Sequence, residues 1–372
     1  MKKLVTKMIK EGKFGLSEAI ILLILSNIAR IFLPYPRLLA ELGGPAAWMT
    51  PLGGLAVALA GVYLMTAVLK KSPDKTIIEI SEDAFGPVVG IAVNLVVISF
   101  FLSVSMLFTR EFSEALILST LPYTPISVIT TTYLSVGILG AYLGIEAMAR
   151  AARLTAPYIF GGIVILLISL SPQWSLDNLF PFFGTGPVQV FGQGAFSTAA
   201  LTEIILAAVL VQAMGGPDNI GKIGYRSMLI AFLLLSGLLA ATVLTLGREY
   251  TTESTLPFYT VTRNIFLGRF FQRVEAVFVI IWSIIGGLKI ALTLYGASVS
   301  LARTLKLPDY RPLIWPLGLV IFILSLLPPD MSTAVKLDAD FLRPLSLVPN
   351  YLLPLLIIAA YWLRRRVGRA DG

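Results

Sequence analysis

Three groups of polar and ionisable residues interrupt the long apolar stretches of this chain, and their types suit the binding of a small solute. The first group lies in LSNIARIFLPYPRLL and consists of Ser26, Asn27 and Arg30, followed by two prolines. Because Pro34 has no backbone N–H and crowds the carbonyl of Arg30, a helix here should kink or unwind near residues 27–33. Backbone groups released there could face a ligand, although a simple proline kink with a snorkelling Arg30 explains the same residues.

The second group lies in GQGAFSTAALTEIILAAVL and consists of Ser197, Thr198, Thr202 and Glu203. Apolar residues continue on both sides of Glu203, so no nearby loop can hydrate its carboxylate. A carboxyl group in such a segment is either protonated by burial or paired with a cation or with donors from an interrupted helix. A neutral glutamic acid that hydrogen-bonds inside a helical bundle, with no ligand, is the alternative.

The third group lies in WSIIGGLKIALTLYGASVS, where small and polar residues recur at steps of three and four and so share one stripe of a helix. The members of this stripe are Ser283, Gly286, Lys289, Thr293, Gly296 and Ser300. Small residues alone favour close helix packing. Packing does not explain Lys289, which stands about three turns from either end of the apolar segment. Lys289, with Thr293 one turn further along, is therefore a candidate internal counter-charge that can pair with Glu203.

These groups must be positioned by membrane-spanning helices, because the chain is 56% hydrophobic and only 13% charged. Soluble domains carry roughly a quarter charged residues. Apolar runs of about 17 to 25 residues, the length that crosses a bilayer, follow one another from end to end. We predict an all-α integral membrane protein with ten spans: 16–39, 48–69, 88–118, 125–142, 156–170, 188–214, 225–246, 274–301, 313–327 and 348–363.

The composition also excludes several kinds of chemistry. The chain has no cysteine and no histidine, which removes disulfides, thiol nucleophiles, imidazole bases and His/Cys zinc sites. No predicted span contains an aspartate dyad, and a Ser/His pair is impossible. We therefore expect no enzyme, no catalytic residue, no metal and no cofactor. The net charge of +8 suits cytoplasmic loops of a membrane protein better than nucleic-acid binding.

The lysines and arginines predict the topology. With ten spans, 19 of the 29 basic residues lie on the side of the N-terminus and only 7, including Lys336 and Arg343, on the opposite side. Both termini should then be cytoplasmic. We expect one transmembrane domain, 1–372, made of a repeat at 15–171, a second at 188–363, and tails at 1–14 and 364–372. Arg110, Glu111 and Glu114, at the outer end of a span, are expected to be solvated.

Several segments of the chain resemble a known family. They are LFTREFSEALILSTLPYTPISVI, GIEAMARAARLTAPYI, FGQGAFSTAALTEIILA, LGRFFQRVEAVFVIIW and GGLKIALTLYGASVSLARTLKLPDYRPL. In this order they resemble the B subunits of Ger-type spore germinant receptors, within the amino acid, polyamine and organocation transporter superfamily. The resemblance implies a LeuT-like fold of two inverted five-helix repeats, in which helices 1 and 6 are broken around the solute. It also implies that helix 8 lies against helix 1, with Lys289 where sodium-coupled relatives bind a cation.

Transporter relatives often have a glycine-rich string at the helix 1 break, whereas this chain has SNIARIFLP, so Arg30 could itself bind an anionic group. The resemblance further implies a germinant-sensing subunit in the spore inner membrane, with an A-type membrane subunit and a C-type lipoprotein as partners. The germinant expected first is an amino acid. Two alternatives remain open: a proton-coupled amino-acid transporter in which Glu203 or Lys289 changes protonation, and an ion-conducting element of the germination complex.

Overall fold

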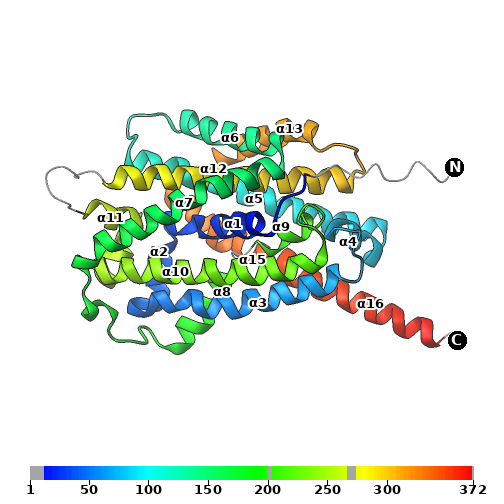
Figure 1. Cartoon of the computed structure of the whole chain (residues 1–372), viewed down its shortest axis with the longest axis horizontal. Helices are drawn as coiled ribbons and strands as arrows, with labels where there is room; N and C mark the ends of the chain where they lie inside the picture. The colour runs from blue at the N-terminus through cyan, green and yellow to red at the C-terminus, as the bar shows by residue number, and fades with distance from the viewer. Residues whose placement is uncertain (1–11, 200–202, 266–273, 371–372) are drawn as a thin grey trace.

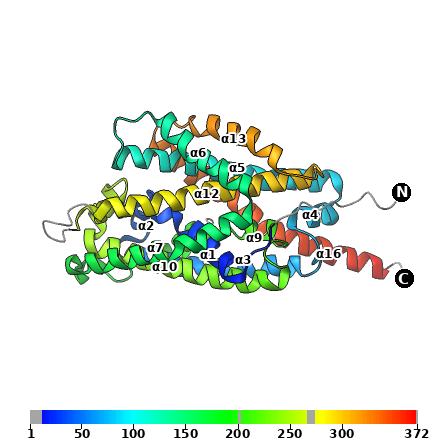
Figure 2. The same ribbon diagram turned by 45° about the horizontal axis from the view of Figure 1, so that its top comes forward.

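The computed structural model describes residues 12–199, 203–265 and 274–370, and within these ranges the regular structure is entirely helical. The helices run roughly side by side along the long axis of the molecule (Figures 1 and 2). The first half contains α1 (Leu16–Ile28), η1 (Ala29–Phe32), α2 (Tyr35–Gly43), η2 (Gly44–Met49), α3 (Thr50–Leu69), α4 (Ile77–Phe85), α5 (Pro87–Ser119), α6 (Ile126–Leu143), α7 (Ile145–Leu170), η3 (Ser171–Gln173) and η4 (Leu176–Leu179).

The second half contains η5 (Gln189–Gln193), α8 (Gly194–Ala199), α9 (Ile204–Val209), α10 (Pro217–Glu253), α11 (Pro257–Arg263), α12 (Val274–Thr304), α13 (Arg311–Ser325), α14 (Met331–Leu337), η6 (Asp338–Leu342), α15 (Arg343–Leu347), η7 (Val348–Leu352) and α16 (Leu353–Ala370). The three segments η5, η6 and η7 are π-helical turns. Such turns are rare and occur often at functional sites.

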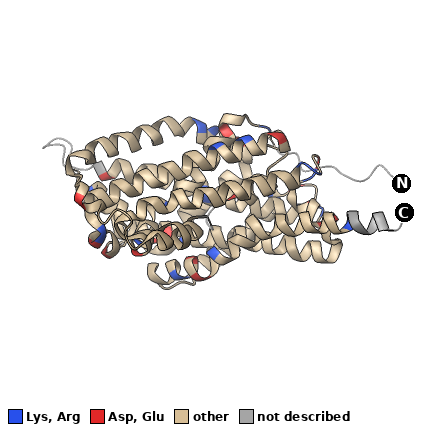
Figure 3. Ribbon diagram, turned by 90° about the horizontal axis from the view of Figure 1, so that it is seen from below, with Lys and Arg blue, Asp and Glu red and all other residues tan. Residues whose placement is uncertain are grey.

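Seven helical stretches in the described part of the chain are long and apolar enough to cross a membrane. They are Tyr35–Leu69, Pro87–Ser119, Ile126–Leu143, Ile145–Gln173, Pro217–Glu253, Glu275–Thr304 and Met331–Arg364, and Arg311–Ser325 is a shorter apolar helix. The charged residues lie mainly near the two ends of the bundle, with long uncharged stretches between them (Figure 3). This arrangement is that of an integral membrane protein.

The core of the bundle forms around α12, which is the most buried of the seven stretches. It packs against α5 and α6 and also contacts α1, η1 and α9. Close packing depends on the predicted small-residue stripe, because a Cβ added at Gly286 would lie 2.7 Å from the ring of Phe112. The first described residues and the end of α16 lie toward the same end of the bundle (Figure 1).

The structure differs from the sequence prediction at one end of the bundle. Helical structure leading into the last span begins at Met331 and not near residue 348, so Arg343 is buried and not part of an outer loop. The expectation of solvated side chains is wrong for Arg110 and Glu111, which are buried, whereas Glu114 is partly exposed. Helix α14 packs against α5, and Arg110 pairs with Glu114 and donates to the carbonyl of Pro329 at 3.0 Å. These contacts cover Arg110 and Glu111 at that end of α5.

Candidate functional site

The chain leaves α-helical geometry immediately after Ile28, within the segment that the prolines predicted. Helix α1 is followed by the 3₁₀ turn η1, Leu33 is extended, and α2 begins at Tyr35. Because Pro34 cannot donate to the carbonyl of Arg30, that carbonyl accepts instead from the N–H of Leu33 at 3.1 Å. The turn directs the buried side chain of Arg30 into the bundle.

The chain also leaves helical geometry just before α9. Helix α8 is described as far as Ala199 and α9 begins at Ile204, while the predicted ligand residue Thr202 lies outside the described residues. Glu203, just before α9, has non-helical backbone angles of φ −108° and ψ 47°. The N–H of Ile205 donates to the side-chain oxygen of Asn350 at 2.9 Å, so a buried amide from η7 caps the start of α9.

The structure brings the end of α1 and the start of α9 together at an ion pair with α12. The Lys289 ammonium contacts the Glu203 carboxylate, and the Ser26 hydroxyl donates to the other oxygen of that carboxylate. Lys289 Nζ also donates to the carbonyl of Ser26 at 3.1 Å. None of these three side chains is more than 2% exposed. Three predicted residues from distant parts of the sequence therefore form one buried ionic contact, the Ser26–Glu203–Lys289 cluster.

Other predicted residues bond mainly to their own helices. Asn27 donates to the carbonyl of Leu23 at 2.8 Å, Thr198 donates to that of Gly194 at 2.7 Å, and Thr293 donates to that of Lys289 at 3.0 Å. Thr293 also lies 2.6 Å from the hydroxyl of Ser105, which joins α12 to α5 beside the ion pair. These hydroxyl and amide groups support the backbone around the cluster.

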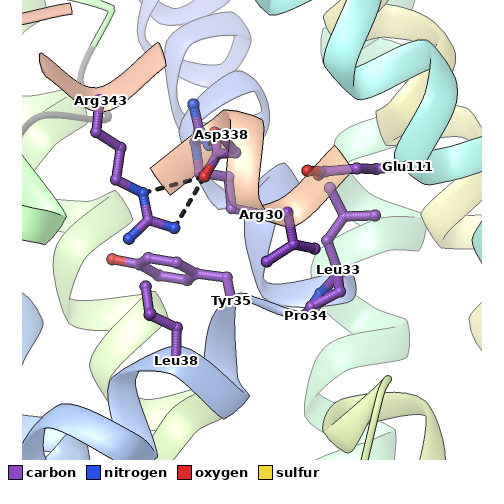
Figure 4. Close-up of a pocket in the computed structure, with 9 residues that line it drawn as sticks. Arg30, Leu33, Pro34, Tyr35, Leu38, Glu111, Asp338 and Arg343 are labelled. Carbon is purple, nitrogen blue, oxygen red and sulfur yellow. Dashed lines mark hydrogen bonds and ion pairs between the residues drawn. The ribbon is translucent and has the colours of Figure 1, made fainter. Parts of the chain in front are cut away.

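A second ionic cluster, the Arg30–Asp338–Arg343 triad, lies next to the first. Arg30 Nη1 lies 3.0 Å from one oxygen of Asp338, and Arg343 donates to the other oxygen from Nη2 at 2.8 Å and from Nε at 3.0 Å. The remaining Nη1 of Arg343 donates to the predicted residue Ser197 at 2.9 Å. Figure 4 shows the guanidinium of Arg343 facing the carboxylate of Asp338. Opposite charges at these distances compensate each other away from water.

One aromatic ring lies between the two clusters. The guanidinium carbon of Arg30 lies 4.6 Å from the centre of the Phe108 ring, and Lys289 Nζ lies 4.8 Å from it. The electron-rich face of an aromatic ring attracts cations, most strongly where water is absent. The ring of Phe108 on α5 therefore helps to hold two buried cations close together.

A small cavity of about 20 Å³ borders the triad. Its walls are formed by Arg30, Leu33, Pro34, Tyr35, Leu38, Glu111, Val335, Asp338 and Arg343 (Figure 4). This volume has room for about one water molecule. An amino acid would fit only after the surrounding helices moved apart.

Comparison with known proteins identifies the family. Residues 14–333 match the family model described as "Spore germination protein". The chain belongs to this family. It is 26% identical to spore germination protein KB of Bacillus subtilis (strain 168) over 377 residues, covering 98% of both chains. It is 25% identical to spore germination protein A2 of the same organism, covering 90% of this chain and 92% of the relative.

Two solved transporters share the fold of this chain. Mhp1, a nucleobase-cation-symport-1 family transporter in a closed conformation with bromovinylhydantoin bound, matches 97% of this chain and 82% of its own chain with a TM-score of 0.69 and 13% identity. MhsT in complex with L-phenylalanine matches 95% and 99% with a TM-score of 0.65 and 14% identity. The chain therefore has a transporter fold of the LeuT type, as the resemblance implied.

Sequence reasoning missed four buried polar residues of this germination protein, namely Glu111, Asp338, Arg343 and Asn350. Asp338 and Arg343 stand five residues apart in LDADFLRPLSL, just before the last predicted span, and opposite charges at that spacing could have indicated an ion pair. Asn350 gave no signal that distinguishes a cap from a loop residue. Glu111 gave the wrong signal because its charged neighbours suggested a solvated helix end.

Proposed function

We propose that this chain is the germinant-sensing membrane subunit of a spore germinant receptor. In this proposal ten transmembrane helices form two inverted five-helix repeats, with helix 1 broken at η1 and helix 6 broken between α8 and α9. A small germinant, most readily an amino acid, binds where the two breaks meet. The Ser26–Glu203–Lys289 cluster carries the proposal, because it joins both interrupted segments to α12 through buried charges.

Charged groups at this depth are normally kept for a function, since they destabilise a membrane protein unless they are paired. The proposed ligand-binding residues are Ser26, Asn27, Arg30, Ser197, Thr198, Thr202 and Glu203, with Lys289 and Thr293 as the internal cation site. An amino acid could exchange its carboxylate and ammonium for the internal partners of these groups. The relatives' names, which refer to spore germination, support the sensing role. The L-phenylalanine bound by the structural neighbour MhsT supports an amino acid as the ligand.

Binding requires a more open state of the bundle, because the cavity is about 20 Å³. A ligand shifts the equilibrium between closed and open states only by the difference in its affinity for them. The 3₁₀ turn η1 and the π-helical turn η6 flank the cavity, and these non-α-helical turns are the places where the backbone can change with least loss of helix hydrogen bonds. We expect the bacterial cell membrane or the spore inner membrane as the location, with both termini in the cytoplasm. The expected partners are the A-type subunit and the C-type lipoprotein.

The decisive experiment measures the germination response of spores that carry single substitutions. Glu203→Gln and Lys289→Ala should abolish the response to amino-acid germinants while the protein still accumulates in the membrane. Glu146→Gln is the matched control, because Glu146 forms an ion pair with Arg150 at an exposed end of α7 and should respond as the wild type does. Wild-type responses in both cluster variants would remove the proposed site.

A proton-coupled amino-acid transporter is the second candidate, and the transporter fold of both structural neighbours favours it. Purified protein in liposomes separates the two functions. Amino-acid uptake that collapses with the pH gradient would indicate transport, whereas binding without flux would indicate sensing. An electrical current across the same membrane would instead indicate the ion-conducting element.

A further inference from the structure

Glu111 of α5 is a buried carboxyl group that the proposed ligand site does not use. Its side chain points from α5 toward Arg30 and Asp338 and lines the cavity beside the triad (Figure 4). The residue is 5% exposed, and among residues 12–199, 203–265 and 274–370 it makes no direct ion pair or hydrogen bond. One turn further along the same helix, Glu114 pairs with Arg110. The two glutamates therefore differ in what neutralises them.

Without Glu111, the charged groups around the cavity include more positive than negative charges. Arg30 from η1 and Arg343 from α15 share the single carboxylate of Asp338 from η6, so the triad by itself carries one excess positive charge. These three line the same cavity as Glu111, and Tyr35 from α2 is the titratable neighbour in its wall. From the other described helices against α5, α14 contributes the apolar Val335, and Lys289 of α12 lies beyond the Phe108 ring with its own partner Glu203.

Two opposing influences therefore act on the Glu111 proton. Burial favours the neutral acid, and the excess positive charge of the triad favours the carboxylate. When Glu111 is ionised it balances the triad, and when it is protonated the positive charge is left for another anion. The cavity between them is the place where such an anion would meet both arginines.

We propose that Glu111 is a proton-binding site, and that its protonated form lets the carboxylate of a small ligand bind beside Arg30 and Arg343. Proton and carboxylate then bind together, and each raises the affinity of the protein for the other by the same factor. This inference rests on the proposed function for the nature of the ligand. The proton site itself is defined by the cavity and by the triad.

Infrared difference spectroscopy of the full chain in lipid nanodiscs tests the proton site directly. Between about pH 9 and about pH 5 the wild type should gain the C=O stretching band of one buried carboxylic acid. Glu111→Gln should lack this band. Glu114→Gln, the same substitution one turn away on the same helix, should keep it. If Glu111→Gln does not fold, Glu111→Asp should keep a titrating band at a shifted frequency.

Sodium propionate, a carboxylate without an amino group, tests the coupling against equal sodium chloride. If propionate prefers the protonated protein tenfold, it should raise the midpoint of the wild-type band by about one pH unit. No titrating band in the wild type, or a band that survives in Glu111→Gln, would overturn the proton site. A titrating band that propionate does not move would overturn the carboxylate coupling. Amino-acid binding with no titrating band would refute this inference alone, and a titrating band without any amino-acid response would refute the proposed function alone.

Discussion

Replacing Lys289 with methionine leaves the Glu203 carboxylate without its cation in a place that water does not reach. Lys289 is fully buried and Glu203 is 1% exposed, so solvent screening of the remaining charge is negligible. The methionine side chain keeps nearly the same length and fills the same space. The variant therefore tests the charge more than the packing of α12.

The expected loss of stability has an upper limit set by protonation. A buried carboxylate left alone destabilises a protein by about 3–5 kcal/mol. Glu203 can relieve this by binding a proton. An ordinary glutamate has a pKa of about 4.3, so pH 7 lies about 2.7 units above it and protonation there costs about 3.7 kcal/mol. At about pH 5.5 the same step costs only about 1.6 kcal/mol. The destabilisation of Lys289→Met should therefore decrease as the pH falls.

The opposite substitution should show the opposite pH trend. Glu203→Gln leaves the Lys289 ammonium without its carboxylate partner. An ordinary lysine has a pKa of about 10.4, so removing its proton costs about 4.6 kcal/mol at pH 7 but about 2.6 kcal/mol at about pH 8.5. Its destabilisation should decrease as the pH rises. The double variant carries neither charge and should lose less than either single variant, since a buried pair can be replaced by neutral groups at little cost.

Unfolding of the detergent-solubilised protein in sodium dodecyl sulfate, followed by fluorescence of the five tryptophans, measures these free energies. The exposed pair Glu146 and Arg150 supplies the control, because Glu146→Gln should change stability by less than about 1 kcal/mol with no pH trend. The reasoning is refuted if both single variants lose the same amount at every pH. It is equally refuted if the double variant loses the sum of the two.

Three further predictions concern two helix caps and one helix contact, and thermal melting in detergent measures each. Asn350→Leu removes the cap from a buried N–H of α9 and should cost about 1–3 kcal/mol, and Asn350→Asp, which keeps an acceptor, should recover part of it. Gly54→Ala places a Cβ 2.8 Å from a side chain of α8 and should lower the free energy of unfolding by about 1–3 kcal/mol. Gly237→Ala in α10 is the control, because its Cβ would have nothing within 4 Å, and it should leave the stability unchanged or raise it by up to about 1 kcal/mol. Equal effects of the two substitutions would contradict the packing of α3 against α8. The backbone N–H of Thr333 holds the pKa of Asp330 below its ordinary value, so the stability from this helix cap is present above about pH 4 and lost as the pH falls through the lowered pKa. Asp330→Ala should lower the melting temperature at neutral pH but not in strong acid, and a loss that persists in acid would contradict the cap.

The features that sequence predicts best in this chain are those that local chemistry determines. Pro34 lacks a donor wherever it lies in the fold, so the interruption after Ile28 follows from the sequence alone. A carboxylate in an apolar segment needs a cation, and Lys289 was the buried candidate for Glu203 on another predicted span. The contact between Glu203 and Lys289 can therefore be predicted from the sequence.

The features that sequence did not predict depend on which helix ends are covered. Asp338 and Arg343 have the composition of an outer loop, and only the packing of α14 and η6 against α5 makes them part of the interior. Glu111 is buried by the same contacts. Pairing across hundreds of residues leaves no periodic signal in one sequence, so the Arg30–Asp338–Arg343 triad required the three-dimensional structure.

Taken together, the two clusters and Glu111 contain three basic groups and three carboxyl groups around one aromatic ring and one small cavity. A movement that enlarges the cavity by separating Arg30 or Arg343 from Asp338 leaves charges unpaired away from water, which destabilises the open state. A neutral solute cannot replace the lost partners. An amino acid carries one group of each sign, so it can compensate a separated cation and a separated carboxylate at once. Under the proposed function, the charges that hold the bundle closed are therefore also the charges that select the ligand.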